Sequence, residues 1–197
     1  MYHIVNDKRA KVSARLIYEG LLECLKKKPF NKITIRDIQE ASGVGRATFY
    51  RHFDSLSDVL MAKCDKVFEE LANKLDANHS FDNLENLDHD NYLLEVIQHI
   101  YDNWEIFEIL VSVDRRDILY NCQMRYMKDR TRKYLPDFDE NTVEFQLTSH
   151  MRAGVLESII NMWLEDDRKE KPEEIVEVVK GEAFQKGISF ILQMSSN

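Results

Sequence analysis

The chain has 197 residues, of which 44% are hydrophobic and 31% charged, a length and balance that suit one domain or a small head joined to a larger body. Its six glycines and three prolines are too few for a fold rich in hairpin turns, so the composition favours helices over sheets. The longest stretch without a charge, residues 187–197, is far shorter than the roughly 18 apolar residues of a membrane span, and no apolar signal segment follows Met1. We therefore expect a soluble, cytoplasmic protein with no membrane partner.

Cysteine usage and catalytic motifs exclude several classes of protein. Cys24, Cys64 and Cys122 form no CxxC pair and lie in apolar patterns, so they predict buried thiols rather than a disulfide framework or a zinc site. The sequence has no GxSxG, HExxH or P-loop motif. We expect no metal, no cofactor and no enzymatic activity.

The net charge of -8 is unevenly distributed along the chain. Residues 1–53 contain 11 Lys and Arg against 5 Asp and Glu, a balance of +6, whereas the remainder has a balance of -14. A basic head on an acidic body suits a protein that presents one end to a polyanion. The alternative is a chance fluctuation among solvated surface charges.

The first helices are marked by apolar spacing and by helix-ending residues. An amphipathic helix is predicted by residues that recur every three or four positions, and Pro29 ends it; these residues are Ala10, Ala14, Ile17, Leu21 and Leu25. A short second helix starts at Thr34, which has Asp37 in the capping-box position, and stops at Ser42 and Gly43.

The third and fourth helices follow a tight turn. Gly43 supplies the positive φ that the turn requires, Val44 is an apolar plug, and a third helix is predicted from about Arg46 to His52. Ser55 and Asp58 repeat the capping pattern at the start of a long fourth helix. Its apolar face consists of Leu60, Cys64, Val67, Leu71 and Leu75.

The rest of the chain predicts further helices after a polar link between Ala77 and Asp90. Apolar spacing indicates helices through residues 94–101, around 106–111 and from about 116 to 134, and two long helices at about 140–165 and 172–194. Pro172 occupies a first-turn position where proline is tolerated. No run alternates with period two long enough to demand a strand, so the predicted fold class is all-α.

Three short helices with a glycine turn, inside the only basic part of the chain, form a helix-turn-helix pattern. Residues 34–53 read TIRDIQEASGVGRATFYRHF, and this segment resembles the DNA-binding signature of the tetracycline-repressor (TetR/AcrR) family of transcriptional regulators. The matching positions are Thr34, Ile35, Ile38, Ala41, Gly43, Val44, Thr48, Phe49, Tyr50, His52 and Phe53. The resemblance is close over residues 8–75 and weaker from Gly154 to Ile175, which looks like the dimerising end of many members.

The resemblance implies an all-helical homodimer whose larger domain holds an effector pocket. On this basis we expect a helix-turn-helix domain over residues 1–54, a connecting helix over 55–77, and a ligand-binding and dimerisation domain over 78–197. The expected partners are double-stranded DNA, a second copy of the chain and an unidentified small molecule. The expected function is a ligand-responsive repressor that binds a palindromic operator.

The resemblance also implies roles for individual residues of the head. Arg36 and Arg46 are expected to reach base edges, because an arginine can bond guanine O6 and N7 together. Phosphate or thymine-methyl contacts are expected at Thr34, Thr48, Tyr50 and His52, and the DNA-binding set is completed by Gly45, Ala47 and Arg51. Gly45 stands where members often have a capping Ser or Thr, and Leu56 where they commonly have a phosphate-binding Lys. The alternatives are solvated charges for Arg46 and Arg51 and a core edge for Tyr50 and His52. Phe49 and Phe53 are expected to face inward.

Candidates in the body depend on the same resemblance. The candidate ligand-binding residues are Trp104, Phe107, Tyr120, Tyr126, Gln146 and His150, for which ordinary core positions are the alternative. The candidate dimer-interface residues are Met151, Val155, Ile159, Met162, Val176, Val179, Ala183 and Phe190. A ligand-sensing coregulator that acts through a protein partner, with a vestigial helix-turn-helix, is the alternative function, and Leu56 and the acidic total are its supports.

Overall fold

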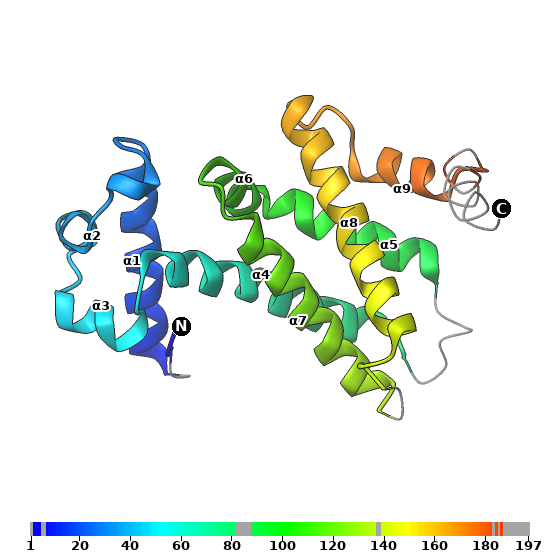
Figure 1. Cartoon of the computed structure of the whole chain (residues 1–197), viewed down its shortest axis with the longest axis horizontal. Helices are drawn as coiled ribbons and strands as arrows, with labels where there is room; N and C mark the ends of the chain where they lie inside the picture. Colours follow the sequence, from blue (N-terminus) through cyan, green and yellow to red (C-terminus); the bar gives the residue numbers. More distant parts are fainter. Residues whose placement is uncertain are drawn as a thin grey trace. The chain divides into compact units, whose positions relative to one another are not determined.

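The computed structural model describes residues 2–4, 7–81, 88–136, 139–182, 184 and 186. Within these residues the chain folds into α-helices and one short 3-10 helix, η1, with no β-strand (Figure 1). In chain order the elements are α1 (Lys8–Leu25), η1 (Phe30–Lys32), α2 (Ile35–Ser42), α3 (Arg46–His52), α4 (Leu56–Asn78), α5 (His89–Asp102), α6 (Trp104–Ser112), α7 (Arg116–Tyr134), α8 (Val143–Glu165) and α9 (Pro172–Lys180). The all-α prediction is confirmed. None of the helices described is long and apolar enough to cross a membrane.

Local capping explains where most helices begin and end. The predicted bounds of α2 and α3 agree with the structure, and Ser55 Oγ accepts a hydrogen bond from the Asp58 amide at the start of α4. The helix expected from residue 140 begins at Val143 instead, because Thr142 caps it. The last helix was expected to reach about residue 194. The structure gives α9 up to Lys180 with Gly181 as its C-cap; Glu182, Phe184 and Lys186 beyond it are also helical, and the other residues from 183 on lie outside those described.

Residue contacts divide the chain into two compact units. The head unit comprises residues 1–69 and 105–125, and the body unit comprises residues 70–104 and 126–197. This division differs from the predicted boundaries at residues 54 and 77, because α6 and the first half of α7 group with α1 to α3 and the first part of α4. Within the head unit, for example, the rings of Phe68 and Phe107 meet edge to face at 6.4 Å.

The head unit has an apolar core in which α1, α2 and α3 lie together (Figure 1). Ile17 and Leu21 of α1, Ile38 of α2, and Phe49 and Phe53 are all buried. The three cysteines are buried free thiols, as predicted.

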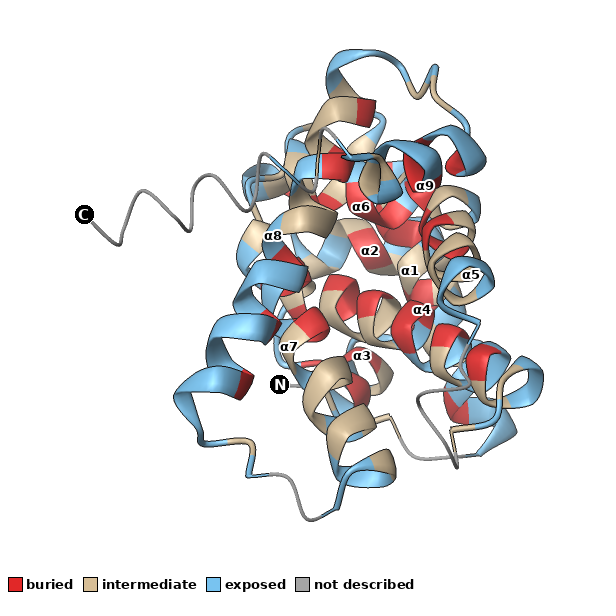
Figure 2. Cartoon of the chain, turned by 90° about the vertical axis from the view of Figure 1, so that its right-hand side faces the viewer, coloured by how far each residue is buried: buried red, intermediate tan, exposed pale blue. Residues whose placement is uncertain are grey.

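The body unit combines the end of α4, the end of α7, and α5, α8 and α9. Asp76 of α4 accepts hydrogen bonds from Arg130, Lys133 and Tyr134 of α7. The Arg130 guanidinium also lies 4.5 Å from the Phe81 ring centroid. These contacts fix the end of α4 to α7. On the first turns of α8, most residues are exposed (Figure 2).

Candidate nucleic-acid interface

The start of α2 is fixed by a capping box. The Asp37 amide donates to Thr34 Oγ1 at 3.3 Å, and the Thr34 amide donates to Asp37 Oδ2 at 2.7 Å. Lys28 Nζ lies 2.6 Å from the same carboxylate. Hydrogen bonds from Lys28 and Thr34 hold the pKa of Asp37 well below its usual range. Lys28, which follows the end of α1, therefore ties that end to the start of α2.

Arg36 lies on the solvent side of α2 and is only weakly restrained. Its Nε donates to Glu40 Oε1 at 2.9 Å, and the two side chains are 86% and 64% exposed. An ion pair this exposed contributes little free energy. The guanidinium can therefore leave Glu40 for a base or a phosphate at small cost.

The turn between α2 and α3 has the predicted backbone conformation. Gly43 has φ of +70°, and its amide donates to Gln39 O at 2.9 Å, which ends α2. Val44 is buried at 9% exposure and anchors the turn to the core. Gly45 is the N-cap of α3 and provides no side-chain hydrogen bond. The seven-residue α3 therefore depends on tertiary contacts for its stability.

The two faces of α3 differ in burial. Phe49 and Phe53 are each 1% exposed and face the core, as predicted. The opposite face presents the exposed residues Arg46, Ala47, Tyr50 and Arg51, and Thr48 is half-buried.

Arg46 and Tyr50 form a pair one helical turn apart. The Arg46 guanidinium carbon lies 5.5 Å from the centroid of the Tyr50 ring, and Arg46 Nη2 lies 3.5 Å from the Tyr50 hydroxyl. Tyr50 is 43% exposed and also meets the Phe49 ring edge-on at 5.6 Å. The tyrosine is thereby anchored to the core and holds the arginine on the outer face of α3.

His52 departs from the predicted set of DNA contacts. Its side chain is 3% exposed, and its Nδ1 is buried without a hydrogen-bond partner. Burial, with a smaller effect from Arg51, holds the pKa of His52 below its usual range. A phosphate contact by this side chain stays a prediction, and its burial with Phe49 and Phe53 on the inner face favours the alternative of a core edge.

Comparisons with known proteins agree with this geometry. Residues 17–62 match a family model described as "Bacterial regulatory proteins, tetR family", and residues 88–181 match one described as "Transcriptional regulator C-terminal region". The chain belongs to the TetR family. It is thus a DNA-binding transcriptional regulator with a helix-turn-helix in its head unit.

A solved structure has a similar fold. The crystal structure of Lin0861 from Listeria innocua aligns with a TM-score of 0.75 at 17% sequence identity, over 96% of this chain and 97% of that chain. At this identity the likeness concerns the fold alone. No curated protein matches the sequence.

The candidate ligand-binding residues of this TetR-family regulator have very different surroundings. Phe107 is completely buried beside Phe68 in the head unit, and Trp104 is 7% exposed and meets Trp163 edge-on at 5.9 Å in the body unit. Both therefore occupy ordinary core positions in the protomer. Tyr126 is half-buried in the body unit, whereas Tyr120, Gln146 and His150 are exposed.

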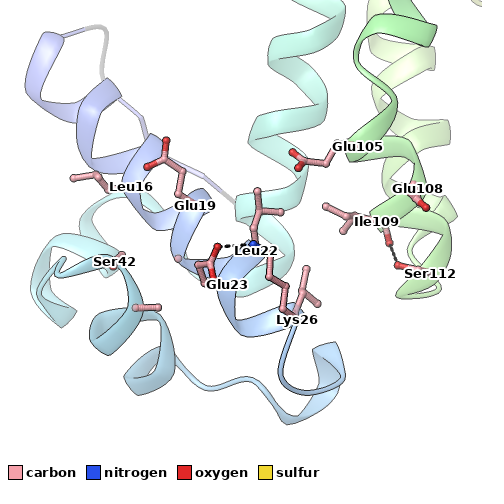
Figure 3. Close-up of a pocket in the computed structure, with 13 residues that line it drawn as sticks. Leu16, Glu19, Leu22, Glu23, Lys26, Ser42, Glu105, Glu108, Ile109 and Ser112 are labelled. Atoms are coloured by element: carbon pink, nitrogen blue, oxygen red, sulfur yellow. Dashed lines mark hydrogen bonds and ion pairs between the residues drawn. The ribbon is translucent and has the colours of Figure 1, made fainter.

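A cavity of about 830 Å³ lies in the head unit among α1, α2 and α6 (Figure 3). It is lined by apolar side chains such as Leu22 and Ile109, and by carboxylates of α1 and α6. None of the six predicted ligand-binding residues lines it. Among the residues described, no cluster of histidine, cysteine and carboxylate side chains could hold a metal ion.

The candidate dimer-interface residues divide into two groups. Met151 is 43% exposed, and Val155, Met162 and Val179 are partly exposed. Ile159 and Val176 are 8% and 5% exposed, so they already belong largely to the core of the protomer and would add little area to an interface. Ala183 and Phe190 lie outside the residues described. Three strongly exposed apolar residues that were not among the candidates are Val143, Leu147 and Val178.

Proposed function

We propose that this TetR-family regulator is a repressor that acts in the cytoplasm, binds a near-palindromic operator as a homodimer and releases it when a small molecule binds. The observation that carries the proposal is the outer face of α3, where Arg46 is held by Tyr50 and exposed to solvent. A helix of this kind fits the major groove, with its first turn toward the base edges. Arg46 lies in that first turn, and Arg36 of α2 supplies a second exposed guanidinium.

Dimerisation is supported by an apolar stripe on α8. Val143, Leu147 and Met151 are spaced four residues apart, so they share one face of the helix, and they are 80%, 57% and 43% exposed. An exposed stripe of this kind marks an interaction surface. A second copy packed on this stripe would make the pair two-fold symmetric, with recognition helices roughly 34–36 Å apart.

Binding to DNA is tested with the purified protein and its own upstream region. At low salt we expect a clear preference for that DNA over a scrambled duplex of equal length and composition, centred on an inverted repeat. Equal affinity for both duplexes would contradict the proposal. A partner that survives nuclease treatment would favour the coregulator instead.

Dimerisation is tested by sedimentation of charge-introducing variants. Leu147→Glu and Met151→Glu should shift the protein from dimer to monomer at concentrations where the unmodified chain is dimeric, because a carboxylate in an apolar interface is strongly unfavourable. Val12→Glu alters an exposed apolar residue of α1 and should leave the dimer intact. A monomeric unmodified protein, or dimers in all variants, would count against the α8 interface.

A further inference from the structure

The N-terminal segment Tyr2–Ile4 forms a strap against the end of the recognition helix. The His3 amide donates to His52 O at 2.7 Å, and Tyr2 forms an antiparallel bridge with Phe53. The last carbonyls of a helix have no partner within the helix. The strap therefore supplies a donor that α3 cannot supply for itself.

The side chain of Tyr2 continues this connection to two other helices. Its hydroxyl donates to Asp65 Oδ2 of α4 at 2.8 Å. Arg125 Nη2 of α7 lies 2.7 Å from Asp65 Oδ1 and 3.0 Å from Oδ2. Burial, and then the hydrogen bond to Asp65, raise the pKa of Tyr2, so the phenol remains a hydrogen-bond donor to Asp65. All of these residues belong to the head unit.

We propose that Tyr2 is a positioning residue for DNA binding, which acts through Asp65 and Arg125 to hold the C-terminal end of α3 against α4 and α7. The helix needs such a restraint because it has two turns and no side-chain N-cap. A helix that is already ordered loses less conformational entropy when it binds DNA, so its affinity is higher. This inference rests on the proposed DNA contact of α3.

The first test is amide hydrogen exchange on the free full-length protein. Tyr2→Phe keeps the ring and removes the hydroxyl, and it should lower protection of the α3 amides roughly three- to ten-fold, the equilibrium effect of one hydrogen bond. A variant lacking residues 1–4 should lower protection further, because it also loses the His3 amide. The control is Tyr18→Phe, which removes a hydroxyl that joins α1 to α6 in the same unit by donating to Glu105 Oε2 at 3.2 Å. It should leave α3 protection unchanged.

The second test is a double-mutant cycle on operator affinity. Tyr2→Phe and Asp65→Ala should each weaken binding more than two-fold, and Tyr2→Phe should have no further effect in the Asp65→Ala background, because both substitutions break the same connection. A Tyr2→Phe effect that persists in that background would mean that Tyr2 contacts DNA directly, and would overturn the proposal.

The outcomes separate this inference from the proposed function. Unchanged α3 exchange in both Tyr2→Phe and the truncated variant refutes the strap, whatever the protein binds. Reduced exchange protection with operator affinity within two-fold of the unmodified protein also refutes the positioning role. No sequence preference in the unmodified protein refutes the proposed function, while exchange still decides whether the strap holds α3.

Discussion

Replacing Gly20 with alanine should push α1 and α2 apart. A Cβ atom at Gly20 would lie 2.8 Å from Ser42 Cβ, 3.2 Å from Ser42 N and 3.3 Å from Ser42 Cα. Carbon atoms in contact prefer about 3.5–4.0 Å, so the two helices must separate by roughly 1 Å. The obstacle includes backbone, which cannot rotate away as a flexible side chain would.

The expected net effect combines two opposing terms. Overpacking of this kind costs about 1–3 kcal/mol, and the better helix propensity of alanine returns up to about 1 kcal/mol. With the full propensity gain, Gly20→Ala should therefore lower the free energy of unfolding by about 1 kcal/mol, between roughly 0 and 2 kcal/mol. Because α2 carries Arg36 and leads into α3, operator affinity should also fall about ten-fold, the cost of one misplaced base contact.

Urea unfolding followed by circular dichroism measures the stability term. Gly154→Ala is the control, since Gly154 lies inside α8 and no other part of the described chain comes within 4 Å of the point where its Cβ would lie. That variant should be more stable by up to about 1 kcal/mol. Adding Ser42→Gly to Gly20→Ala should recover part of the loss. It cannot recover all of it, because Ser42 Oγ also bonds Ile38 O and the Val44 amide. If Gly20→Ala stabilises the protein as Gly154→Ala does, the close approach of α1 and α2 is refuted.

Two further predictions concern pH. Burial raises the pKa of Asp76, but hydrogen bonds from three side chains of α7 outweigh it and lower that pKa to about 2. After allowance for partial exposure, Asp76→Asn should lower the free energy of unfolding by roughly 1–2 kcal/mol at pH 7. This stabilisation by the carboxylate is fully present above about pH 4 and is lost as the pH falls through 2. A difference in unfolding free energy between the two proteins that does not shrink at low pH would contradict this. Burial lowers the pKa of His52 in the folded protein, so below about pH 6.5 the unfolded chain takes up a proton at this residue before the folded protein does. Acidification should therefore lower the free energy of unfolding of the unmodified protein more than that of His52→Phe. If the urea midpoints of the two proteins change equally from pH 7.5 to 5.5, His52 is not the group responsible.

Local sequence signals predicted much of the fold. The Thr34 and Asp37 pair set the start of α2, and Gly43 set its end, because caps and positive φ depend on residues only a few positions apart. The inward orientation of Phe49 and Phe53 also followed from helical spacing.

The same spacing contained a signal about His52 that the resemblance obscured. Phe49, His52 and Phe53 stand at i, i+3 and i+4, so they share one face of α3, and burial of two of them implies burial of the third. The role of Tyr2 could not be predicted from spacing, because its hydrogen bond with Asp65 joins residues 63 positions apart. Pairing at such a distance depends on how helices pack and leaves no periodic trace in the sequence.

The body was less predictable because its candidates were chosen by composition. Aromatic side chains occur both in cores and in ligand pockets, so the sequence does not tell which of the two a given aromatic residue belongs to. Only the burial in the structure distinguishes Phe107, which is completely buried, from Tyr120, which is exposed. In the same way, Ile159 and Met151 lie on one helix in an apolar pattern, yet only Met151 is exposed.

The central claim, that the outer face of α3 contacts bases, is tested most directly by the base preference of Arg46→Ala across an operator library. We predict a loss of about 1–3 kcal/mol confined to one base pair in each half-site. Arg152→Ala removes an exposed arginine of the body unit and controls for net charge. An equal loss on every sequence would make Arg46 a phosphate contact, and unchanged binding would contradict the account of α3 as the helix that reads the operator.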